Sequence, residues 1–416
     1  RIFLLLLKEL VVVIVDNQHH NNNHPHHPHH PHPHHPQQQQ QQHGQEMHAL
    51  ACLQTLGERL VILSPLRVPS FAFAWLDLIG HYMLLPRLAG SSSRRCWLLL
   101  LQLLKEWFMF LRPFIIREYL PAAVKKLYDG TLRLLLVLLH DFPEFLCCFH
   151  FELCECLPFN CVQLRNLILS AFPRSMKLPD PFLPNLKVDL LPEIRILPAV
   201  YTPFPLILFK KGIKQIVDLY LIHKNYSLLP QLLKRLLLPP SLALTTGTKY
   251  DITIINALLL YLGTAPLTRQ QQQQQQGAAA GGEEGAGGDG LTTSPQQQQP
   301  KTSTTGGSPA GSPAAGGSSN SSMNACGCSQ EIVLYLFREA DMEGRYLLLN
   351  SIANHLRYPN AHTHFFSCLL LWLFIESNNE CIKEQITRVL LERLIVHRPH
   401  PWGLLITFIE LIKNQR

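Results

Sequence analysis

Charged residues are scarce in this sequence, and long uninterrupted apolar runs are missing. Lys, Arg, Asp and Glu together make up 16% of the 416 residues. A helix that spans a membrane needs roughly 20 consecutive apolar residues. The apolar stretches 2–15 and 96–111 are each interrupted by a Lys-Glu pair, and 365–375 is too short. Residues 2–15 also lack the small-residue cleavage site of a signal peptide. We therefore expect a soluble protein that does not associate with membranes.

Motifs of several common enzyme classes are missing as well. The sequence contains no GxxxxGK[ST] phosphate loop, no GxSxG nucleophile elbow and no HExxH metal motif. A GxGxxG motif does occur at 285–290, but a dinucleotide site needs a strand before it and a helix after it. Both flanks of this motif are low in complexity. The sequence therefore predicts no enzymatic activity and no cofactor.

The cysteines do not follow a disulfide or zinc pattern. Their number, eleven, is odd and no secretory signal accompanies them, which indicates a reducing compartment. Five of them lie among apolar residues between 147 and 161 without the paired spacing of zinc modules, so we expect buried free thiols. The His/Pro-rich tract at 17–48 supplies imidazoles but no fixed geometry. We predict no metal site.

Two segments differ from the rest in composition. Residues 17–48 are rich in His, Pro, Asn and Gln, and residues 269–329 are rich in Gln, Gly, Ala and Ser. Neither segment can bury enough apolar surface to offset the entropy that is lost on ordering. We expect two disordered insertions.

The remaining sequence has the apolar spacing of helices. In 380–396, Ile382, Ile386, Val389 and Leu390 recur at helical intervals, and Ser377 with Glu380 would form a capping box. No convincing run of period-two strands is present. Similar helical patterns cover 71–85, 96–111, 132–145, 162–171, 212–224, 252–262 and 345–356. Short apolar helices joined by brief turns, without a strict repeat, predict an all-α fold of HEAT-like stacked helical hairpins, an α-solenoid.

A proline-rich connector divides the helical pattern into two halves. Residues 172–209 contain eight prolines and cannot form a long helix. Their apolar residues need a surface to cover, so we expect an ordered, extended segment. The predicted order is a leading helix (1–16), an insertion (17–48), the first helical half (49–171), the connector (172–209), the first part of the second half (210–268), an insertion (269–329) and the rest of the second half (330–416).

Several long stretches resemble one known family. Residues 161–194 read CVQLRNLILSAFPRSMKLPDPFLPNLKVDLLPEI, and residues 384–414 read EQITRVLLERLIVHRPHPWGLLITFIELIKN. These stretches, with 71–88, 131–146 and 344–374, are similar to the C-terminal, Not-type superfamily homology domain of the largest scaffold subunit of the Ccr–Not messenger-RNA deadenylase complex. The two low-complexity tracts depart from the family pattern, 195–250 matches loosely, and the family continues past the equivalent of Asn414.

The resemblance implies a non-catalytic scaffold domain. Its expected partners are the Not-box subunits of the complex and short peptides of translational repressors, with RNA engaged only indirectly. It also implies a role in messenger-RNA deadenylation, decay and translational repression, in the cytoplasm, including mRNA-processing bodies, and in the nucleus. Two alternatives stay open: an unrelated α-solenoid adaptor, and an RNA-binding helical protein, although the basic residues here are dispersed rather than gathered in a stripe.

The connector supplies the candidate partner-binding residues Phe182, Asn185 and Lys187. Neighbouring prolines fix much of the backbone, so the segment loses little entropy on ordering and can present side chains in a defined geometry. One interpretation is that the outer face of the connector binds a Not-box partner. The other is that the connector is an ordered strap with Phe182 buried beneath it.

Overall fold

The structure is a computed structural model that describes residues 50–117, 119–184, 186–280 and 319–413. Its contacts divide the chain into two compact units: unit 1 comprises Arg1–Pro203 and Met342–Arg416, and unit 2 comprises Phe204–Asp341. Unit 2 is therefore inserted in the sequence of unit 1. The predicted leading helix (1–16) and first insertion (17–48) lie outside the described residues, as does the GxGxxG motif.

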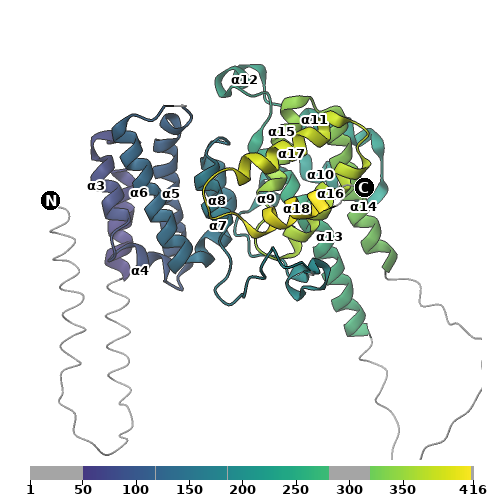
Figure 1. The fold of residues 1–416 in the computed structure, drawn as a ribbon, viewed down its shortest axis with the longest axis horizontal. Helices are drawn as coiled ribbons and strands as arrows, with labels where there is room; N and C mark the ends of the chain where they lie inside the picture. Colours follow the sequence, from purple (N-terminus) through teal and green to yellow (C-terminus); the bar gives the residue numbers. More distant parts are fainter. Residues whose placement is uncertain (1–49, 118, 185, 281–318, 414–416) are drawn as a thin grey trace, which may run out of the picture. The chain divides into compact units, whose positions relative to one another are not determined.

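Unit 1 is all-helical in the ranges described (Figure 1). A helix over 50–62 and the 3-10 turn η1 (Pro69–Phe71) precede its named helices. These are α3 (Ala72–Ile79), α4 (Leu85–Ala89), α5 (Arg94–Ile115), α6 (Ala122–Asp141), α7 (Pro143–Cys156), α8 (Val162–Leu169), α15 (Met342–Ala353), α16 (Ala361–Glu376), α17 (Glu380–Leu394) and α18 (Trp402–Lys413).

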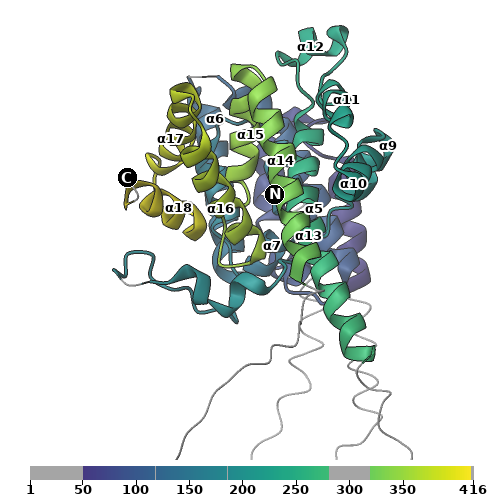
Figure 2. The ribbon, with the colours of Figure 1, turned by 90° about the vertical axis from the view of Figure 1, so that its right-hand side faces the viewer.

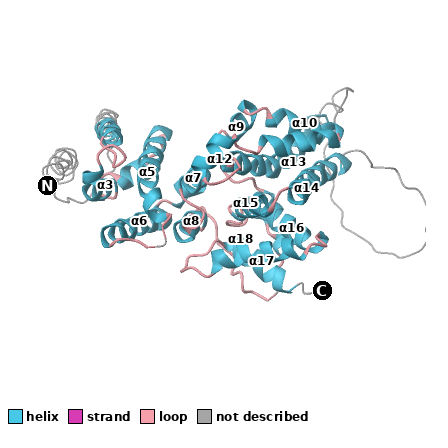
Figure 3. Cartoon of the chain, turned by 90° about the horizontal axis from the view of Figure 1, so that it is seen from above, coloured by secondary structure: helices cyan, strands magenta, loops and turns pink. Residues whose placement is uncertain are grey.

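The helices of unit 1 pack in successive pairs, as the predicted solenoid requires. Helix α3 contacts α6, α5 contacts α7, and α7 contacts α8, while α15 packs on α17 and α16 on α18. Seen from above, several of these helices are viewed close to end-on (Figure 3). At the N-terminal end, Trp75 and Trp107 stack at 5.8 Å, and each indole N–H is satisfied, by Leu60 O and Thr131 Oγ1 respectively. The expected all-α fold is confirmed.

Local sequence signals set several helix ends. Pro143 has no backbone N–H to donate and begins α7, so the helix predicted over 132–145 is two helices, with α6 ending at Asp141. Helix α16 is capped by Asn360, whose side chain accepts from the Thr363 N–H at 3.0 Å. Helix α17 is capped by Asn379 and not by the expected Ser377–Glu380 box.

Unit 2 is a second helical body. It contains α9 (Phe204–Lys210), α10 (Ile213–His223), the 3-10 turn η4 (Tyr226–Leu228), α11 (Leu229–Arg235), α12 (Pro240–Thr246), α13 (Ile252–Ala280) and α14 (Ser319–Glu339), as Figure 2 shows from the side. Helix α13 packs on α9 and α14, and the β pairing in the described part of the chain is one bridge between Leu237 and Tyr250. Gly212, at φ +67°, makes the left-handed turn between α9 and α10.

The boundaries of the second insertion differ from the prediction. Helix α13 continues through the glutamine run Gln270–Gln276 to Ala280, and α14 begins at Ser319. Glutamine and alanine are good helix formers, and extending a helix that is already nucleated in a core is cheap. Of the predicted insertion 269–329, residues 281–318 lie outside the described residues.

The grouping of the helices also differs from the predicted halves. The C-terminal helices α15 to α18 belong with α3 to α8 and not with residues 210–268. The connector ends at Pro203, because 204–210 form α9. Periodicity identifies a helix but carries no information about which distant helix will cover it.

A group of buried polar contacts, made by His150 and Asn166 of the first sequence segment of unit 1 with Arg357 and Arg393 of the second, joins the two segments. We call it the buried polar seam. On the α7 side, Arg357 places Nη1 2.7 Å from Nδ1 of His150 and donates from Nη2 to Cys147 O. Asn166 on α8 donates to Arg393 O at 2.7 Å. Arg393 in turn donates to Asn350 O in the last turn of α15, a carbonyl that also accepts from the Asn354 N–H. The Arg357–His150 and Asn166–Arg393 contacts each join residues more than 200 positions apart in the sequence.

Three histidines lie buried in this seam. Burial lowers the pKa of His150 and of His355 well below the usual 6.5, and the positive charge of Arg357 adds to the shift in both. The pKa of His362 falls to about 3, chiefly through burial and secondly through Arg357. All three histidines are therefore neutral in the folded protein at neutral pH.

None of the helices in the ranges described here combines the length and the apolar character needed to cross a bilayer.

We predict that unit 1 loses stability as the pH falls below 6.5. The unfolded chain binds protons there and the buried histidines do not, so the folded state is disfavoured by about 1 kcal/mol per histidine between pH 7 and 5.5. Urea unfolding followed by tryptophan fluorescence measures this, since all five tryptophans belong to unit 1. His355→Phe, which keeps a ring against Phe366, should remove about a third of the pH dependence. An equal unfolding free energy at both pH values would contradict the prediction.

Candidate partner-docking surface

The connector, residues 172–203, lies on unit 1 as an extended strap. It contains two short 3-10 turns, η2 (Val188–Leu190) and η3 (Pro192–Arg195), neither of which buries a side chain. Turn η3 packs on α16. The path of the strap is therefore set by a small number of anchors rather than by a core of its own.

Two anchors hold the first part of the connector. The Arg174 N–H donates to Oε1 of Glu144 at 3.0 Å, and its guanidinium pairs with the same carboxylate. Farther along, the indole N–H of the buried Trp402 donates to Pro179 O at 2.8 Å. Since Trp402 begins α18, this bond places the LPDP stretch of the connector beside the C-terminal helix.

Two more anchors hold the last part. The Ala361 N–H at the start of α16 donates to Ile196 O at 3.0 Å, and the Tyr201 N–H donates to Cys148 O on α7 at 3.2 Å. The Tyr201 ring packs edge-on against Phe149 at 5.5 Å. The connector is thereby fixed at both ends by backbone bonds to helices of unit 1.

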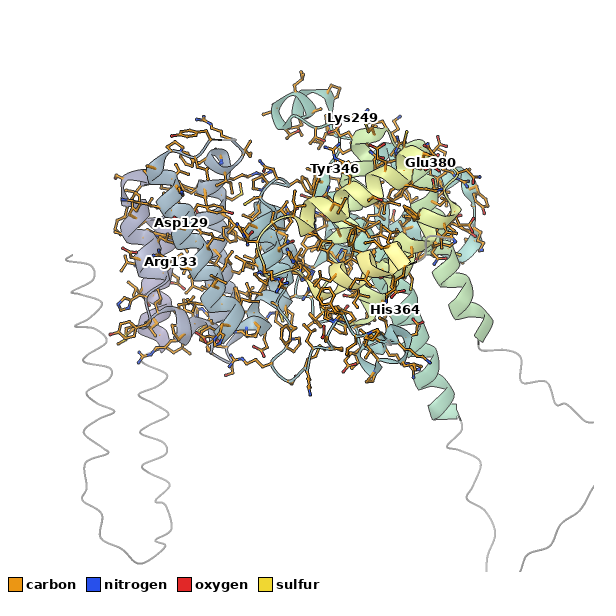
Figure 4. The ribbon with its side chains drawn as sticks, viewed as in Figure 1. Asp129, Arg133, Lys249, Tyr346, His364 and Glu380 are labelled. Carbon is orange, nitrogen blue, oxygen red and sulfur yellow. The ribbon has the colours of Figure 1, made fainter. Side chains whose placement is uncertain are left out.

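An ion pair fastens the middle of the connector. Nε2 of His364, on α16, lies 2.9 Å from Oδ1 of Asp189, and Figure 4 labels this histidine. The pKa of His364 is raised to about 9, first by its hydrogen bond with Cys368 and further by Asp189, while partial burial opposes the shift. His364 is therefore an imidazolium at neutral pH, and Asp189 is the connector group that balances its charge.

The anchored connector exposes several large apolar side chains among its charged ones. Phe182 is 65% exposed, Leu190 74% and Ile196 61%, and Leu183 is also exposed. Anchors at Pro179, Asp189 and Ile196 hold the backbone between these side chains. Large apolar side chains on a fixed backbone are the kind of group that supplies most of the affinity of a protein interface.

The structure settles part of the sequence prediction for this segment. Phe182 is exposed, so the expectation that the strap buries it is wrong; the Phe182 N–H donates to Oδ1 of Asp180. Lys187 is exposed, and Asn185 lies outside the described residues. Leu183, Leu190 and Ile196 were missed as candidates, because an irregular segment has no periodicity from which to read its outer face.

The His, Cys, Asp and Glu side chains of the described ranges do not cluster as metal ligands. No group of three or more His, Cys, Asp and Glu side chains there could hold a metal ion. The five cysteines between 147 and 161 are free and buried, as expected, and helix α7 ends at Cys156 before it reaches Cys161.

Comparison with known proteins assigns the chain to a family. The family model described as "CCR4-Not complex component, Not1" matches residues 34–285 and 307–416, which is most of the sequence. The chain belongs to the Not1 family. The resemblance of the sequence to a Ccr–Not scaffold subunit is thus confirmed.

Not1 relatives align with this sequence over most of its length. CCR4-NOT transcription complex subunit let-711 of Caenorhabditis elegans is 41% identical over 379 residues, which cover 88% of this chain and 12% of the relative. General negative regulator of transcription subunit 1 of Schizosaccharomyces pombe is 36% identical over 362 residues, covering 86% and 15%. The chain therefore spans about an eighth to a seventh of the length of these curated Not1 relatives.

Solved Not1 structures have the same fold. The NOT1 superfamily homology domain from Chaetomium thermophilum matches with a TM-score of 0.70 and 27% identity, over 89% of this chain and 65% of that one. A structure described as the Not1 C-terminal domain in complex with Not4 matches with a TM-score of 0.66 and 28% identity, over 87% and 64%.

We predict that Asp189→Asn lowers the pKa of His364 from about 9 toward its usual value. The hydrogen bond with Cys368 remains, so part of the upward shift should persist. In the unchanged protein, the stabilisation from this ion pair is complete below pH 6.5 and is lost as the pH rises through 9. An NMR titration of the His364 ring protons measures the pKa.

The matched control for this titration is Asp180→Asn. It removes a carboxylate from the same connector but keeps the Oδ1 acceptor for Phe182, and no contact between Asp180 and His364 is present. A His364 pKa that Asp189→Asn leaves unchanged would show that the carboxylate does not act on the ring.

Proposed function

We propose that this chain is a docking domain of a CCR4-Not scaffold that binds Not-box subunits and repressor peptides without performing chemistry itself. The observation that carries the proposal is the anchored connector, which presents Phe182, Leu190 and Ile196 outward. The solved Not1 C-terminal domain in complex with Not4 supports a docking role for this part of the family.

Tethering is the mechanism by which such a domain would act. A partner bound here is held near other components of the same assembly, at an effective concentration that reaches the millimolar range for short linkers. Messenger-RNA deadenylation, decay and translational repression would then be served by proximity. The proposal includes action in the cytoplasm, including mRNA-processing bodies, and in the nucleus.

The connector suits this task because its conformation is fixed before a partner arrives. Proline limits the backbone, and the bonds to Trp402, His364 and Ala361 hold it on unit 1. Little entropy remains to be lost on binding, so contacts to exposed apolar side chains convert more fully into affinity. Lys187, exposed beside this face, would favour a partner that carries an acidic residue.

We predict that Phe182→Ala combined with Leu190→Ala weakens binding of a purified Not-box dimer by at least roughly tenfold, the equivalent of about 1.4 kcal/mol. Both side chains are mostly exposed, so the unfolding free energy should change by less than about 0.5 kcal/mol. Isothermal titration calorimetry and thermal unfolding give the two quantities. Lys187→Ala should cause a smaller loss of affinity that shrinks at high salt.

Tyr82→Ala is the matched control, because Tyr82 is similarly exposed in unit 1 between α3 and α4. Unchanged affinity in that variant, with a loss in the connector variant, supports the assignment. Equal affinity in all variants would place the Not-box contact elsewhere.

We also predict that the purified chain leaves the poly(A) tail of an RNA unchanged in the presence of Mg²⁺. The reason is the lack of any recognisable hydrolytic motif in the sequence. Gel analysis of tail length over time is the measurement. Shortening that a point substitution in this chain abolishes would refute the non-catalytic assignment.

A further inference from the structure

Helix α10 and the turn after it expose apolar side chains to solvent. Leu219 is 46% exposed and Ile222 63%, and the two are three residues apart on α10, so they lie on the same side of the helix. Tyr226, in η4, is 62% exposed, and its ring lies edge-on to that of Tyr220 of α10 at 5.8 Å. Helix α10 therefore has an apolar face that the described elements leave largely uncovered.

Helix α9 packs beside α10 and adds to this surface (Figure 2). Its exposed Leu206 and Phe209 are also three residues apart. The other sides of the two helices pack inward, α9 on α13 and α10 on α14, and α13 packs on α14. The exposed side chains of α9 and α10 are therefore turned away from the same pair of helices. We call Leu206, Phe209, Leu219, Ile222 and Tyr226 the α9–α10 face.

The sequence around this face is strongly basic. Residues 204–250 contain seven Lys and Arg side chains against one acid, Asp218, which gives a formal net charge of +6. Four of the lysines pair with carboxylates of unit 2. Lys210, Lys234 and Arg235 are exposed and form no ion pair with any carboxylate in the described ranges. These three cations are available to a negatively charged partner.

The three cations lie at one end of the face. Lys210 is the last residue of α9 and follows Phe209 directly. Nη1 of Arg235 donates to Lys211 O at 2.6 Å, in the turn between α9 and α10, and this bond brings the end of α11 to the same place. Lys234 precedes Arg235 on α11. The α9–α10 face is thus bordered by positive charge at the turn that joins its two helices.

We propose that the α9–α10 face is a second docking surface of this chain, and that it binds an acidic amphipathic helix of a partner protein. The apolar stripe of that helix lies on the α9–α10 face, and its carboxylates lie toward Lys210, Lys234 and Arg235. The surface is formed by residues of unit 2, so the inference goes beyond the docking role proposed for the connector and does not rest on it.

The composition of the face favours a protein helix over RNA. Single-stranded RNA is held by aromatic side chains that stack on its bases and by cations along its backbone, whereas three of the five side chains of the face are aliphatic. Leucine and isoleucine spaced along a helix match the anchors of a second helix, which recur at intervals of three and four residues. The bordering cations then favour a partner with acidic flanks and disfavour one with basic flanks.

The apolar requirement is tested by fluorescence anisotropy with the full chain. The probe is a fluorescein-labelled peptide of about 18 residues, long enough for five helical turns, with leucines along one helical face and glutamates on the other. Leu219→Gln combined with Ile222→Gln should weaken binding of this peptide at least roughly fivefold. Both side chains are exposed, so the thermal midpoint should stay unchanged. Leu136→Gln combined with Val137→Gln, at two exposed positions of α6 in unit 1, is the matched control and should leave the affinity unchanged.

The charge requirement is tested with the same peptide. Lys210→Glu combined with Lys234→Glu should weaken binding roughly three- to tenfold at 50 mM salt, and by less at 500 mM salt, because ions screen exposed charges. A peptide with lysine in place of every glutamate should bind the unchanged chain more weakly than the acidic peptide does.

Three results would overturn the proposal. The first is that the acidic peptide does not bind, or binds no better than a peptide of the same composition in scrambled order. The second is that the glutamine variant at Leu219 and Ile222 binds as tightly as the unchanged chain. The third is that a poly(A) oligonucleotide binds more tightly than the peptide and loses affinity in the lysine variant alone, which would indicate an RNA surface. None of these measurements uses a Not-box partner or alters the connector, so failure here is distinguishable from failure of the proposed docking function.

Discussion

Three arginine side chains lie in the interior of unit 1, and none of them forms an ion pair with a carboxylate in the described structure. Burying a guanidinium costs several kcal/mol, and charge-assisted bonds to backbone carbonyls offset part of that cost here. Arg165 donates to Leu157 O just past the end of α7, and Arg393 donates to Asn350 O and to Asn354 Oδ1 at the end of α15. Arg357 reaches across to His150 and Cys147. Losing the acceptors would leave a buried charge unpaired, and losing the arginine would leave buried acceptors without a donor, so this seam is the condition for packing α15–α18 on α7 and α8.

The candidate docking surface depends on that seam through the helices that carry the anchors. Trp402 begins α18, and His364 and Ala361 lie in the first turn of α16. Thr363, in the same turn, also accepts from the Arg357 N–H, and Gly403 donates to Arg357 O. A Cβ atom at position 403 would clash with the Thr363 side chain and with Arg357 O, so α18 can lie this close to the 355–363 turn only with glycine there. The contacts of Arg357 with Thr363 and Gly403 thus position α16 and α18, and these helices in turn hold the connector.

Sequence reasoning predicted the helical class and most helices, because patterns such as Ile382, Ile386 and Val389 report burial directly. It missed features that depend on partners distant in the chain. The contact between His150 and Arg357, which are 207 residues apart, has no signal in the sequence of either segment. The exposure of Phe182 was equally hidden, since proline fixes the backbone of the connector but not the direction in which a side chain points. The composition of the glutamine run predicted disorder, but the run continues helix α13, which is already formed where the run begins.

The insertion of unit 2 into the sequence of unit 1 has a consequence for the order in which the protein is made. Asn166 finds its acceptor at Arg393, 227 residues later. At ~5–20 residues per second, a ribosome needs roughly ten to forty-five seconds to supply that acceptor. During this interval unit 2 can be completed, whereas α8 lacks the later helix α17 that packs on it, and Asn166 and His150 lack their later partners Arg393 and Arg357. The waiting time increases with the number of residues between Pro203 and Met342, so the length of the low-complexity tract within unit 2 contributes to how long the first half of unit 1 is exposed to chaperones and proteases.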